Sequence, residues 1–325
     1  MNNSFSYNPL VSVIIPNFNH AQFLHERFRT VVNQGYQNIE IILMDDVSSD
    51  NSIEILKGYE KHPKVKCLLL NEKNSGSTFY QWRKGLAQAS GEIVWIAESD
   101  DSSDLSFLEK AILPLADETV VLSYVQSVDV DVDSNVIQHR LQYTDKFVPN
   151  IWNKDFIVNC HEFLSKYLFE FNVIPNASAV LFRKDLLERV ITRDIQLEKY
   201  RKCGDWLAYN LICTTKNSKI AFNSEALNRF RMSPNNTRNM HENRQRVIRY
   251  AEELAIRSRF KNELGWTSRE AILKVRLIEQ ILVKLSKHEG NINISRAIQS
   301  VYPRLVAQWT LVRLRLTIKK IIGRS

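Results

Sequence analysis

The stretch Glu92-Ile93-Val94-Trp95-Ile96-Ala97-Glu98-Ser99-Asp100-Asp101 joins an apolar run, typical of a buried strand, to three carboxylates. Neighbouring carboxylates repel one another and raise each other's pKa unless a cation lies among them. Mg²⁺ or Mn²⁺ removes that cost and also binds phosphate oxygens, because both ions prefer oxygen ligands. The alternative is an acidic turn that caps a helix predicted over residues 104–116. The stretch therefore predicts a metal-dependent phosphate site or a helix cap at a strand end.

The rest of the N-terminal half alternates between predicted strands and predicted helices. Apolar runs predict strands over residues 11–15, 39–44, 65–70 and 92–97, and helical spacing predicts helices over residues 21–34, 51–62 and 78–89. Pro16 is expected to end the first strand. This alternation predicts an α/β fold, with a Rossmann-like, mainly parallel mixed sheet flanked by helices. Ligands of such sheets bind beyond the carboxyl ends of the strands.

Three polar segments follow predicted strands and are expected to converge at that edge: Pro16-Asn17, Asp45-Asp46 and residues 98–101. A carboxylate at residue 45 or 46 can accept hydrogen bonds from the imide of uracil or from ribose hydroxyls. Turn chemistry and a helix cap are the structural alternative for this segment. The loop Asn74-Ser75-Gly76-Ser77 precedes a predicted helix, where backbone N–H groups can approach a phosphate.

Several common motifs are missing from the sequence. No GxGxxG follows the first predicted strand, and neither GxxxxGK[ST] nor GxSxG occurs. A dinucleotide-binding fold, a P-loop and a hydrolase nucleophile elbow are therefore not supported.

The second half is less regular. The pattern predicts strands over 119–132 and 177–182, helices over 160–171, 184–191 and 205–214, and mostly helix from residue 244. Residues 139–155 read as irregular.

Four segments in order resemble the inverting glycosyltransferases of family 2, which have the GT-A fold. They are Val11-Ser12-Val13-Ile14-Ile15-Pro16-Asn17-Phe18-Asn19, Asp45-Asp46-Val47-Ser48-Ser49-Asp50, Asn74 to Gly76, and Ala89-Ser90-Gly91-Glu92 running into residues 98–101. The resemblance covers residues 9–115. It implies a metal-dependent enzyme that transfers a sugar with inversion from a nucleotide diphosphate sugar, with UDP favoured. The implied acceptor is a hydroxyl of a glycan or lipid-linked precursor of bacterial surface polysaccharide.

The resemblance also implies roles for individual residues. The nucleotide-sugar set is Pro16, Asn17, Phe18, Asn19, Asp45, Asp46, Asn74, Gly76, Asp100 and Arg231. The Mg²⁺ or Mn²⁺ set is Asp100 and Asp101, with Glu98 in support where the family often has Asp.

The segment Lys202-Cys203-Gly204-Asp205-Trp206-Leu207 resembles the region where the family places its catalytic base. Asp205 is the candidate base, and a helix N-cap is its structural alternative. Arg231 ends a strand that resembles the family's aromatic–Arg pair, with a structural salt bridge as the alternative to a diphosphate contact. Relatives often carry a His soon afterwards, where this chain has Met232, Ser233 and Pro234. His241 is expected to be a surface residue rather than a substitute ligand.

Charged residues are distributed unevenly along the chain. Residues 241–325 carry 18 Lys and Arg against 7 Glu, whereas the preceding 240 residues carry 26 basic against 29 acidic side chains. We therefore predict a catalytic domain over residues 1–240, with a nucleotide-sugar half (9–115) and an acceptor half (116–240), followed by a basic helical extension over 241–325. Residues 305–322 read as a basic amphipathic helix that binds an anionic membrane or packs on the catalytic domain. The extension is also a candidate homodimer interface.

Other features bound the location and the partners. The polar N-terminus, the absence of a long apolar segment and four cysteines without metal spacing predict a cytoplasmic protein, peripheral at the cell membrane if the tail binds lipid. No nucleic-acid-binding motif accompanies the basic charge, so nucleic acid is not expected as a partner.

Two rival functions remain open at this point. A catalytically silent nucleotide-sugar or glycan-binding protein would keep the same fold, and Glu98 and the missing His favour it. A sugar-1-phosphate nucleotidyltransferase also has carboxylates at strand ends, but it needs a glycine-rich basic loop that residues 16–20 do not provide.

Overall fold

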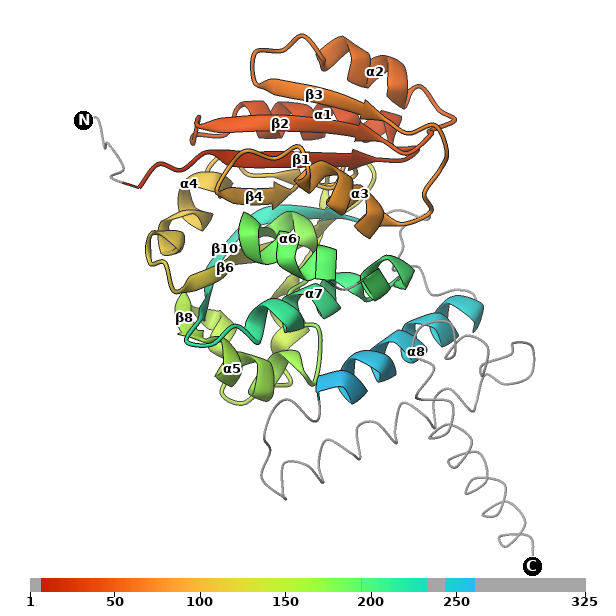
Figure 1. Ribbon diagram of the computed structural model, residues 1–325. Coiled ribbons are helices and arrows are strands. Elements are labelled where there is room, and N and C mark those ends of the chain that lie inside the picture. Colours follow the sequence, from red (N-terminus) through yellow and green to blue (C-terminus); the bar gives the residue numbers. More distant parts are fainter. Residues whose placement is uncertain (1–6, 194, 233–242, 261–325) are drawn as a thin grey trace, which may run out of the picture.

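The computed structural model describes residues 7–193, 195–232 and 243–260, and these fold around one ten-stranded mixed sheet (Figure 1). The strand order is β3-β2-β1-β4-β9-β6-β10-β5, with β7 paired to β6 and β8 paired to β10. The strands are β1 Val11–Asn17, β2 Ile39–Asp45, β3 Val65–Leu70, β4 Ile93–Ile96, β5 Ser102–Ser103, β6 Val120–Val130, β7 Val136–His139, β8 Phe156–Asn159, β9 Val180–Arg183 and β10 Lys219–Arg231. The helices are α1 Ala21–Val32, α2 Ser52–Tyr59, α3 Thr78–Leu86, α4 Phe107–Ala111, α5 Cys160–Phe163, α6 Lys184–Arg193, α7 Gly204–Cys213 and α8 Asn243–Phe260.

The N-terminal half confirms the predicted parallel sheet, because β1 pairs in parallel with both β2 and β4, and β2 with β3. The expectation that Pro16 ends the first strand was wrong, since Pro16 pairs with Met44 inside β1. The reason lies on the other edge of β1. The Ile14 carbonyl accepts from Ala97 on the β4 side, and Pro16, two residues further on, faces the same side beyond the last β4 pair. The missing N–H of proline therefore breaks no ladder bond.

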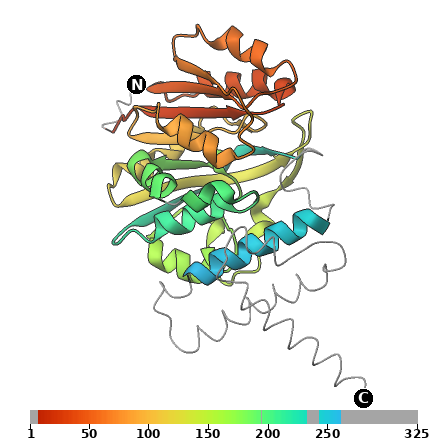
Figure 2. The same ribbon diagram turned by 45° about the vertical axis from the view of Figure 1, so that its right-hand side comes forward.

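Helices cover both faces of the sheet. Side chains along a strand alternate between the two faces, so one strand can contact both helical layers. On one face Val13 and Ile15 pack with α1, α2 and α4, and on the other Ile14 packs with α3, α6 and α7. Figures 1 and 2 show the sheet between these layers. The buried strands β1, β2 and β4 are apolar on both faces, as a doubly covered parallel sheet requires.

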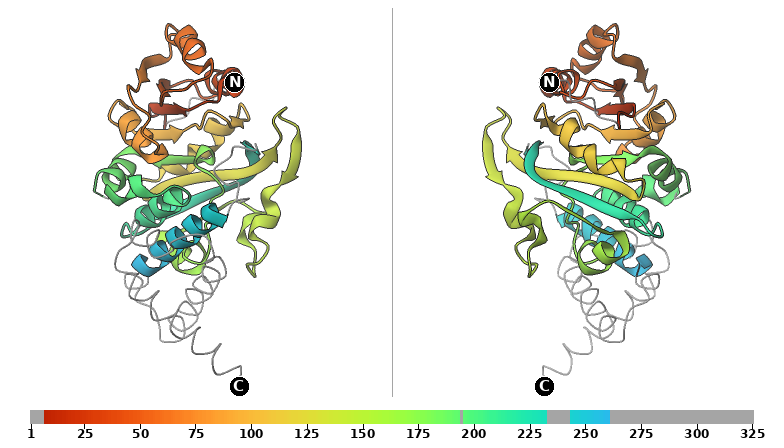
Figure 3. Two further views of the ribbon diagram at one scale, coloured as in Figure 1. Left: turned by 90° about the vertical axis from the view of Figure 1, so that its right-hand side faces the viewer. Right: turned by 90° about the vertical axis from the view of Figure 1, so that its left-hand side faces the viewer.

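The second half adds antiparallel strands and departs further from the sequence pattern. Strand β9 pairs antiparallel with both β4 and β6, and β10 runs parallel to β6. The predicted helix over 104–116 is broken into α4 and a 3₁₀ turn over Leu113–Ala116, where Pro114 lacks an N–H donor. Predicted helix 160–171 reduces to α5 and a π-helical turn over Leu164–Leu168, and predicted strand 177–182 begins with a 3₁₀ turn before β9. The β6–β7 hairpin stands to one side of the sheet (Figure 3).

Helix α8 packs beside α7 (Figures 1 and 2). Its Ala255, Ile256 and Phe260 belong to the same buried apolar cluster as α7. The described start of the predicted extension therefore packs on the rest of the fold, while the boundary at residue 240 stays a prediction. The segment 305–322 lies outside the described residues. Among the helices that are described, none has the length and apolarity needed to cross a bilayer.

Candidate functional site

The ends of β1 and β2 are joined by the side chain of Asp45. Its Oδ2 accepts from Asn17 Nδ2 at 2.8 Å and from Ser48 Oγ at 2.6 Å, and its Oδ1 accepts from the Ser48 backbone N at 2.8 Å. Asn19 enters the same network, because its backbone N donates to Ser48 Oγ at 2.8 Å. Asn19 and Val47 both have positive φ, so two tight turns leave the sheet side by side. The predicted convergence of these strand ends is confirmed, and Asp45 itself holds the turns together.

Asp46 binds the loop that precedes α3. Its Oδ1 accepts from Asn71 Nδ2 at 2.6 Å and from the Ser75 backbone N at 2.8 Å, and its Oδ2 accepts from Ser75 Oγ at 2.8 Å. Asn74 Nδ2 donates to the Asp46 carbonyl at 2.7 Å. Gly76, at φ 60°, adopts the left-handed backbone that glycine favours. The loop therefore lies against the end of β2, and the roles of Ser48, Asn71 and Ser75 were not predicted.

Phe18 is the exposed member of this group. Pro16 and Asn17 are buried, whereas Phe18 keeps 46% of its surface exposed at the end of β1. An exposed aromatic ring beside polar groups offers a flat apolar surface on which a nucleobase can stack.

The carboxylates after β4 differ in environment. Asp101 is buried, and its Oδ1 accepts from the Arg231 backbone N at 2.9 Å. Glu98 keeps some exposed surface, which faces a cavity, and it accepts from Trp82 Nε1 at 3.1 Å. Desolvation, followed by the charge of Asp100, raises the pKa of Glu98 to about 8 and also raises the pKa of Asp101. Asp100 is more exposed than Asp101.

A buried arginine, which the sequence analysis missed, lies under this group. Arg27 Nε donates to the Glu98 carbonyl at 2.8 Å, and its guanidinium lies 5.6 Å from the Trp95 ring centre. Burial lowers the pKa of Arg27, and the charges of Asp101 and Asp100 oppose that shift. The available signal was its place on the apolar face of α1, between Leu24 and Phe28.

Arg231 forms a salt bridge, the structural role that was predicted as the alternative to a diphosphate contact. The fully buried guanidinium donates to Glu26 Oε2 at 2.6 Å and to the carbonyl of Asp100 at 2.7 Å, and it stacks on Phe23 at 4.5 Å. Arg231 thus fixes the backbone of the carboxylate segment, and its predicted diphosphate contact stays a prediction. Met232 is exposed, while Ser233, Pro234 and His241 lie outside the described residues.

One cavity of about 210 Å³ is lined both by the carboxylates after β4 and by residues at the start of α7. Its lining includes His20, Thr78, Phe79, Trp82, Glu98, Asp100, Asp101, Asn176, Ala177, Arg201, Lys202, Asp205 and Phe230. Asp205 lies at the start of α7, more than 100 residues from the carboxylates after β4. Its Oδ1 accepts from the Trp206 backbone N at 2.7 Å and its Oδ2 from Asn172 Nδ2 at 3.4 Å.

Helix α8 supports the segment that leads into α7. The buried Glu252 carboxylate accepts from the backbone N of Arg201 at 2.7 Å, of Lys202 at 2.9 Å and of Cys203 at 2.8 Å. Burial raises the pKa of Glu252 to about 7, although these three bonds oppose the shift. Glu252 therefore fixes the backbone two residues before Asp205.

The residues present suit a small divalent cation. Mg²⁺ is commonly held by one or two carboxylates together with substrate phosphates rather than by a cage of protein ligands. Asp100 and Asp101 supply that number of hard oxygen donors at the cavity, and Glu98 lines it too but accepts from Trp82 Nε1. Within residues 7–193, 195–232 and 243–260, no group of three His, Cys, Asp or Glu side chains is arranged to hold a metal by itself.

The fold is shared with solved glycosyltransferases. The crystal structure of S. aureus TarS 1-349 in complex with UDP matches 94% of this chain and 87% of that chain, with a TM-score of 0.61 and 17% identity. A mannosyltransferase from Pyrobaculum calidifontis in complex with GDP-Man and Mn²⁺ matches 98% of this chain and 89% of that chain, with a TM-score of 0.54 and 17% identity. These likenesses confirm the predicted GT-A fold.

The sequence comparisons define the family. The profile described as "Glycosyl transferase family 2" matches residues 12–190, so the chain belongs to this family. A putative teichuronic acid biosynthesis glycosyltransferase, TuaG of Bacillus subtilis, is 31% identical over 37% of this chain and 47% of the relative. Glycosyltransferase GlyG of Streptococcus pneumoniae is 32% identical over 46% of each chain. The chain thus spans about half the length of these curated relatives.

Proposed function

We propose that this protein is an inverting glycosyltransferase that moves a sugar from a nucleotide diphosphate donor, with UDP favoured, to a hydroxyl of its acceptor. The observation that carries the proposal is the single cavity lined by Asp100, Asp101 and Asp205. Carboxylates suited to a metal–diphosphate complex and a separate carboxylate suited to base catalysis therefore face the same space. Family membership and the UDP complex of TarS support the donor class.

Donor binding would begin at the strand ends. Phe18 would stack on the base, and Asp46, which can accept more bonds than the three it receives, would meet the imide or ribose. Asp100 and Asp101 would hold Mg²⁺ or Mn²⁺, which neutralises charge on the departing diphosphate when bound.

Asp205 would act as the base. As the acceptor oxygen forms a bond to the anomeric carbon, its proton passes to the Asp205 carboxylate and the bond to the diphosphate breaks on the opposite face. Asp205 lies in the first turn of α7, where the helix dipole favours a negative charge.

The test is Asp205→Asn, which keeps the shape of the side chain and removes its basicity. We expect a loss of turnover of about 10²-fold or more with UDP affinity unchanged, because general base catalysis contributes about 10²–10⁴-fold. Transfer and UDP binding would be measured on the same preparations, with Asp185→Asn on α6 as the matched surface control. Loss of UDP binding together with turnover would contradict the base role, and unchanged turnover would exclude it.

A catalytically silent nucleotide-sugar-binding protein is the second candidate. The observation that favours it is Glu98, which stands where the family often has Asp and accepts from Trp82 Nε1. Slow metal-dependent hydrolysis of UDP-sugars by the wild type, absent in Asp205→Asn, would exclude this alternative.

The biological setting is part of the same proposal. TuaG is named for teichuronic acid biosynthesis, which supports a glycan or lipid-linked acceptor in bacterial surface polysaccharide synthesis. Work at the inner face of the cell membrane fits such an acceptor. Membrane binding and dimerisation through the extension stay predictions.

A further inference from the structure

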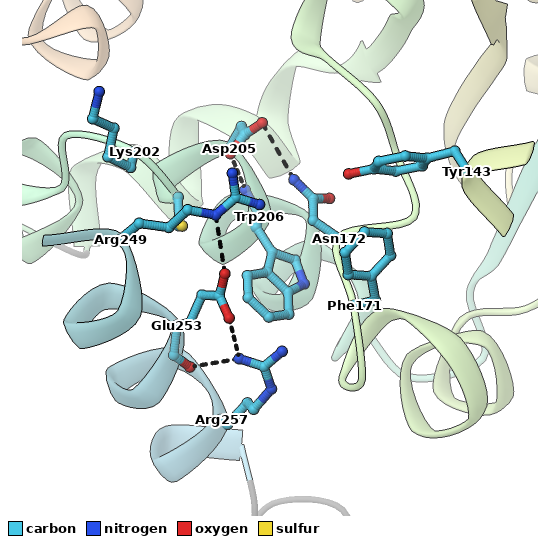
Figure 4. Close-up of a pocket in the computed structure, with 10 residues that line it drawn as sticks. Tyr143, Phe171, Asn172, Lys202, Asp205, Trp206, Arg249, Glu253 and Arg257 are labelled. Carbon is cyan, nitrogen blue, oxygen red and sulfur yellow. Dashed lines mark hydrogen bonds and ion pairs between the residues drawn. The ribbon is translucent and has the colours of Figure 1, made fainter. Parts of the chain in front are cut away.

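A second cavity, of about 130 Å³, lies on the far side of Asp205 between α7 and α8 (Figure 4). It shares Lys202 and Asp205 with the carboxylate-lined cavity and no other residue. Asp205, the candidate base, therefore lies between the carboxylate-lined cavity, where the donor would bind, and the second cavity. If Asp205 takes a proton from the acceptor, the acceptor must approach from the side opposite the donor diphosphate.

One wall of this second cavity is aromatic. Tyr143 and Phe171 are partly exposed, their ring centres are 4.8 Å apart, and both line the cavity next to Asn172 (Figure 4). Exposed rings beside an amide provide a flat apolar surface together with hydrogen-bonding groups, as ligand sites for amphipathic molecules do. Asn172 Oδ1 is buried without a partner among the described residues, and its amide N already donates to Asp205. This wall is suited to a sugar ring.

The opposite wall carries an excess of positive charge. Lys202, Arg249 and Arg257 line the cavity against the two carboxylates of Asp205 and Glu253. Glu253 is shared, because it accepts from Arg249 Nε at 3.0 Å and from Arg257 Nη1 at 3.1 Å. Arg257 also stacks on Trp206 at 4.6 Å and donates to the Glu170 carbonyl at 2.8 Å. Of the two guanidinium groups, that of Arg249 lies nearer to Asp205 (Figure 4).

Lys202 and Arg249 bring two positive charges to this wall. Burial lowers the pKa of Lys202, the carboxylate of Glu252 opposes that shift, and the charge of Arg249 adds to it. Glu252 itself lies beneath the wall and accepts from three backbone N–H groups. Like charges held together at a partly desolvated wall are relieved when an anion binds between them.

We propose that this second cavity binds an anionic group of the acceptor, a carboxylate or a phosphate, and that Arg249 is the residue that selects for it. The inference rests on the proposed function, because it takes the cavity beyond Asp205 as the acceptor side. The aromatic wall holds the sugar ring, and Arg249 holds the charged substituent. The acceptor class is then an acidic glycan or a phosphate-bearing one, rather than a neutral sugar.

The test compares three small probes on protein saturated with UDP and Mg²⁺, so that the carboxylate-lined cavity is filled. Methyl β-D-glucuronide, glycerol 3-phosphate and the neutral methyl β-D-glucoside are titrated, and dissociation constants are measured by ligand-observed NMR. Arg249→Gln removes the charge, Arg249→Lys restores it, and Arg259→Gln removes a charge from the same helix at a different groove. Thermal unfolding confirms that each variant is folded.

We expect at least one anionic probe to bind wild type about tenfold more tightly than the glucoside, since charged hydrogen bonds contribute this much. Arg249→Gln should remove the preference, while Arg249→Lys and Arg259→Gln should keep it. The preferred anionic probe distinguishes a carboxylate from a phosphate source. Equal binding of all probes, no binding of either anion, or a preference that survives Arg249→Gln would overturn the inference.

UDP-sugar hydrolysis on the same preparations separates this inference from the proposed function. Hydrolysis without any anion preference refutes the acceptor class alone. An anion preference that depends on Arg249, without hydrolysis, keeps an anion-binding cavity and favours the silent nucleotide-sugar-binding protein over the transferase.

Discussion

At the scale of single residues, the three carboxylates after β4 are not equivalent. Asp100 is partly exposed, whereas Asp101 is buried against the backbone of Arg231. Glu98 accepts from the indole of Trp82 and has a pKa of about 8. Sequence reasoning placed all three side chains correctly at the strand end. It gave Glu98 only a supporting role, but it could not predict their buried partners, because these come from α3 and β10, far away in the chain.

Asp100→Asn should therefore separate metal-dependent from metal-independent nucleotide binding. We expect UDP affinity in Mg²⁺ or Mn²⁺ to fall by about tenfold or more, because one of two charged metal ligands is lost. Affinity without metal should stay unchanged or rise slightly as repulsion of the diphosphate decreases. Calorimetric titration with and without metal, beside Asp104→Asn as control, measures both values. Equal losses in both conditions would argue against a metal role.

At the scale of elements, the parallel half could be predicted from its pattern, and the second half could not. Strands 39–44 and 65–70 are apolar runs between clear breaks, so local sequence fixes them. Strands β5, β7 and β8 have two to four residues and depend on pairing with β10 or β6. Helix 104–116 fails at Pro114, a break that the sequence does contain. Glu252 forms a brace by accepting hydrogen bonds from the N–H groups of residues 201–203. This brace joins segments about 50 residues apart, and no local sequence pattern predicts it.

Under the proposed function, that brace makes helix α8 a support of the segment that carries the proposed base, Asp205, and this can be tested. Glu252→Gln keeps one acceptor oxygen where the carboxylate has two, so the N–H groups of Arg201, Lys202 and Cys203 lose part of their pairing. An unpaired buried donor costs about 1–3 kcal/mol, and we expect a loss of stability in this range. Amide exchange at residues 201–203 should accelerate, and kcat should fall with little change in UDP affinity.

The matched control is Glu162→Gln, which removes an exposed carboxylate paired with Lys166 and should cost almost nothing. Hydrogen–deuterium exchange by mass spectrometry and thermal unfolding provide the measurements. If exchange over 201–203 is no faster in Glu252→Gln than in Glu162→Gln, the brace does not hold this segment.

At the scale of the whole molecule, titratable groups divide into two sets with opposite effects on stability. Asp50, Asp104 and other surface acids have lowered pKa values, chiefly through hydrogen bonds from neighbouring hydroxyl and N–H groups that outweigh desolvation. Their stabilisation is present above the unfolded pKa of 3.8 and is lost as the pH falls below it. Glu98, Asp101 and Glu252 have raised pKa values because burial favours their neutral forms.

The groups with raised pKa values change the stability of the protein at higher pH. For Glu252 the folded state keeps its proton up to a pKa of about 7, whereas the unfolded group loses it at 4.5. Its favourable contribution is complete below 4.5 and is lost as the pH rises to about 7, and Glu98 extends the same loss to about 8. The two sets together predict maximal stability near pH 5, with a decline towards pH 8 as well as towards pH 3.

Thermal unfolding between pH 3 and pH 9 tests this, with Glu252→Gln as the informative variant because glutamine cannot titrate. We expect its Tm to change less between pH 5 and pH 7 than that of wild type, while both lose stability equally below pH 4. A wild-type Tm that rises from pH 5 to pH 8 would refute the assignment of buried neutral carboxyls. If such a rise occurred only with Mg²⁺ and UDP present, the ligand would be stabilising ionised carboxylates. The metal-free curve therefore decides the prediction, and the liganded curve reports whether Asp100 and Asp101 bind the metal–nucleotide complex in their charged forms.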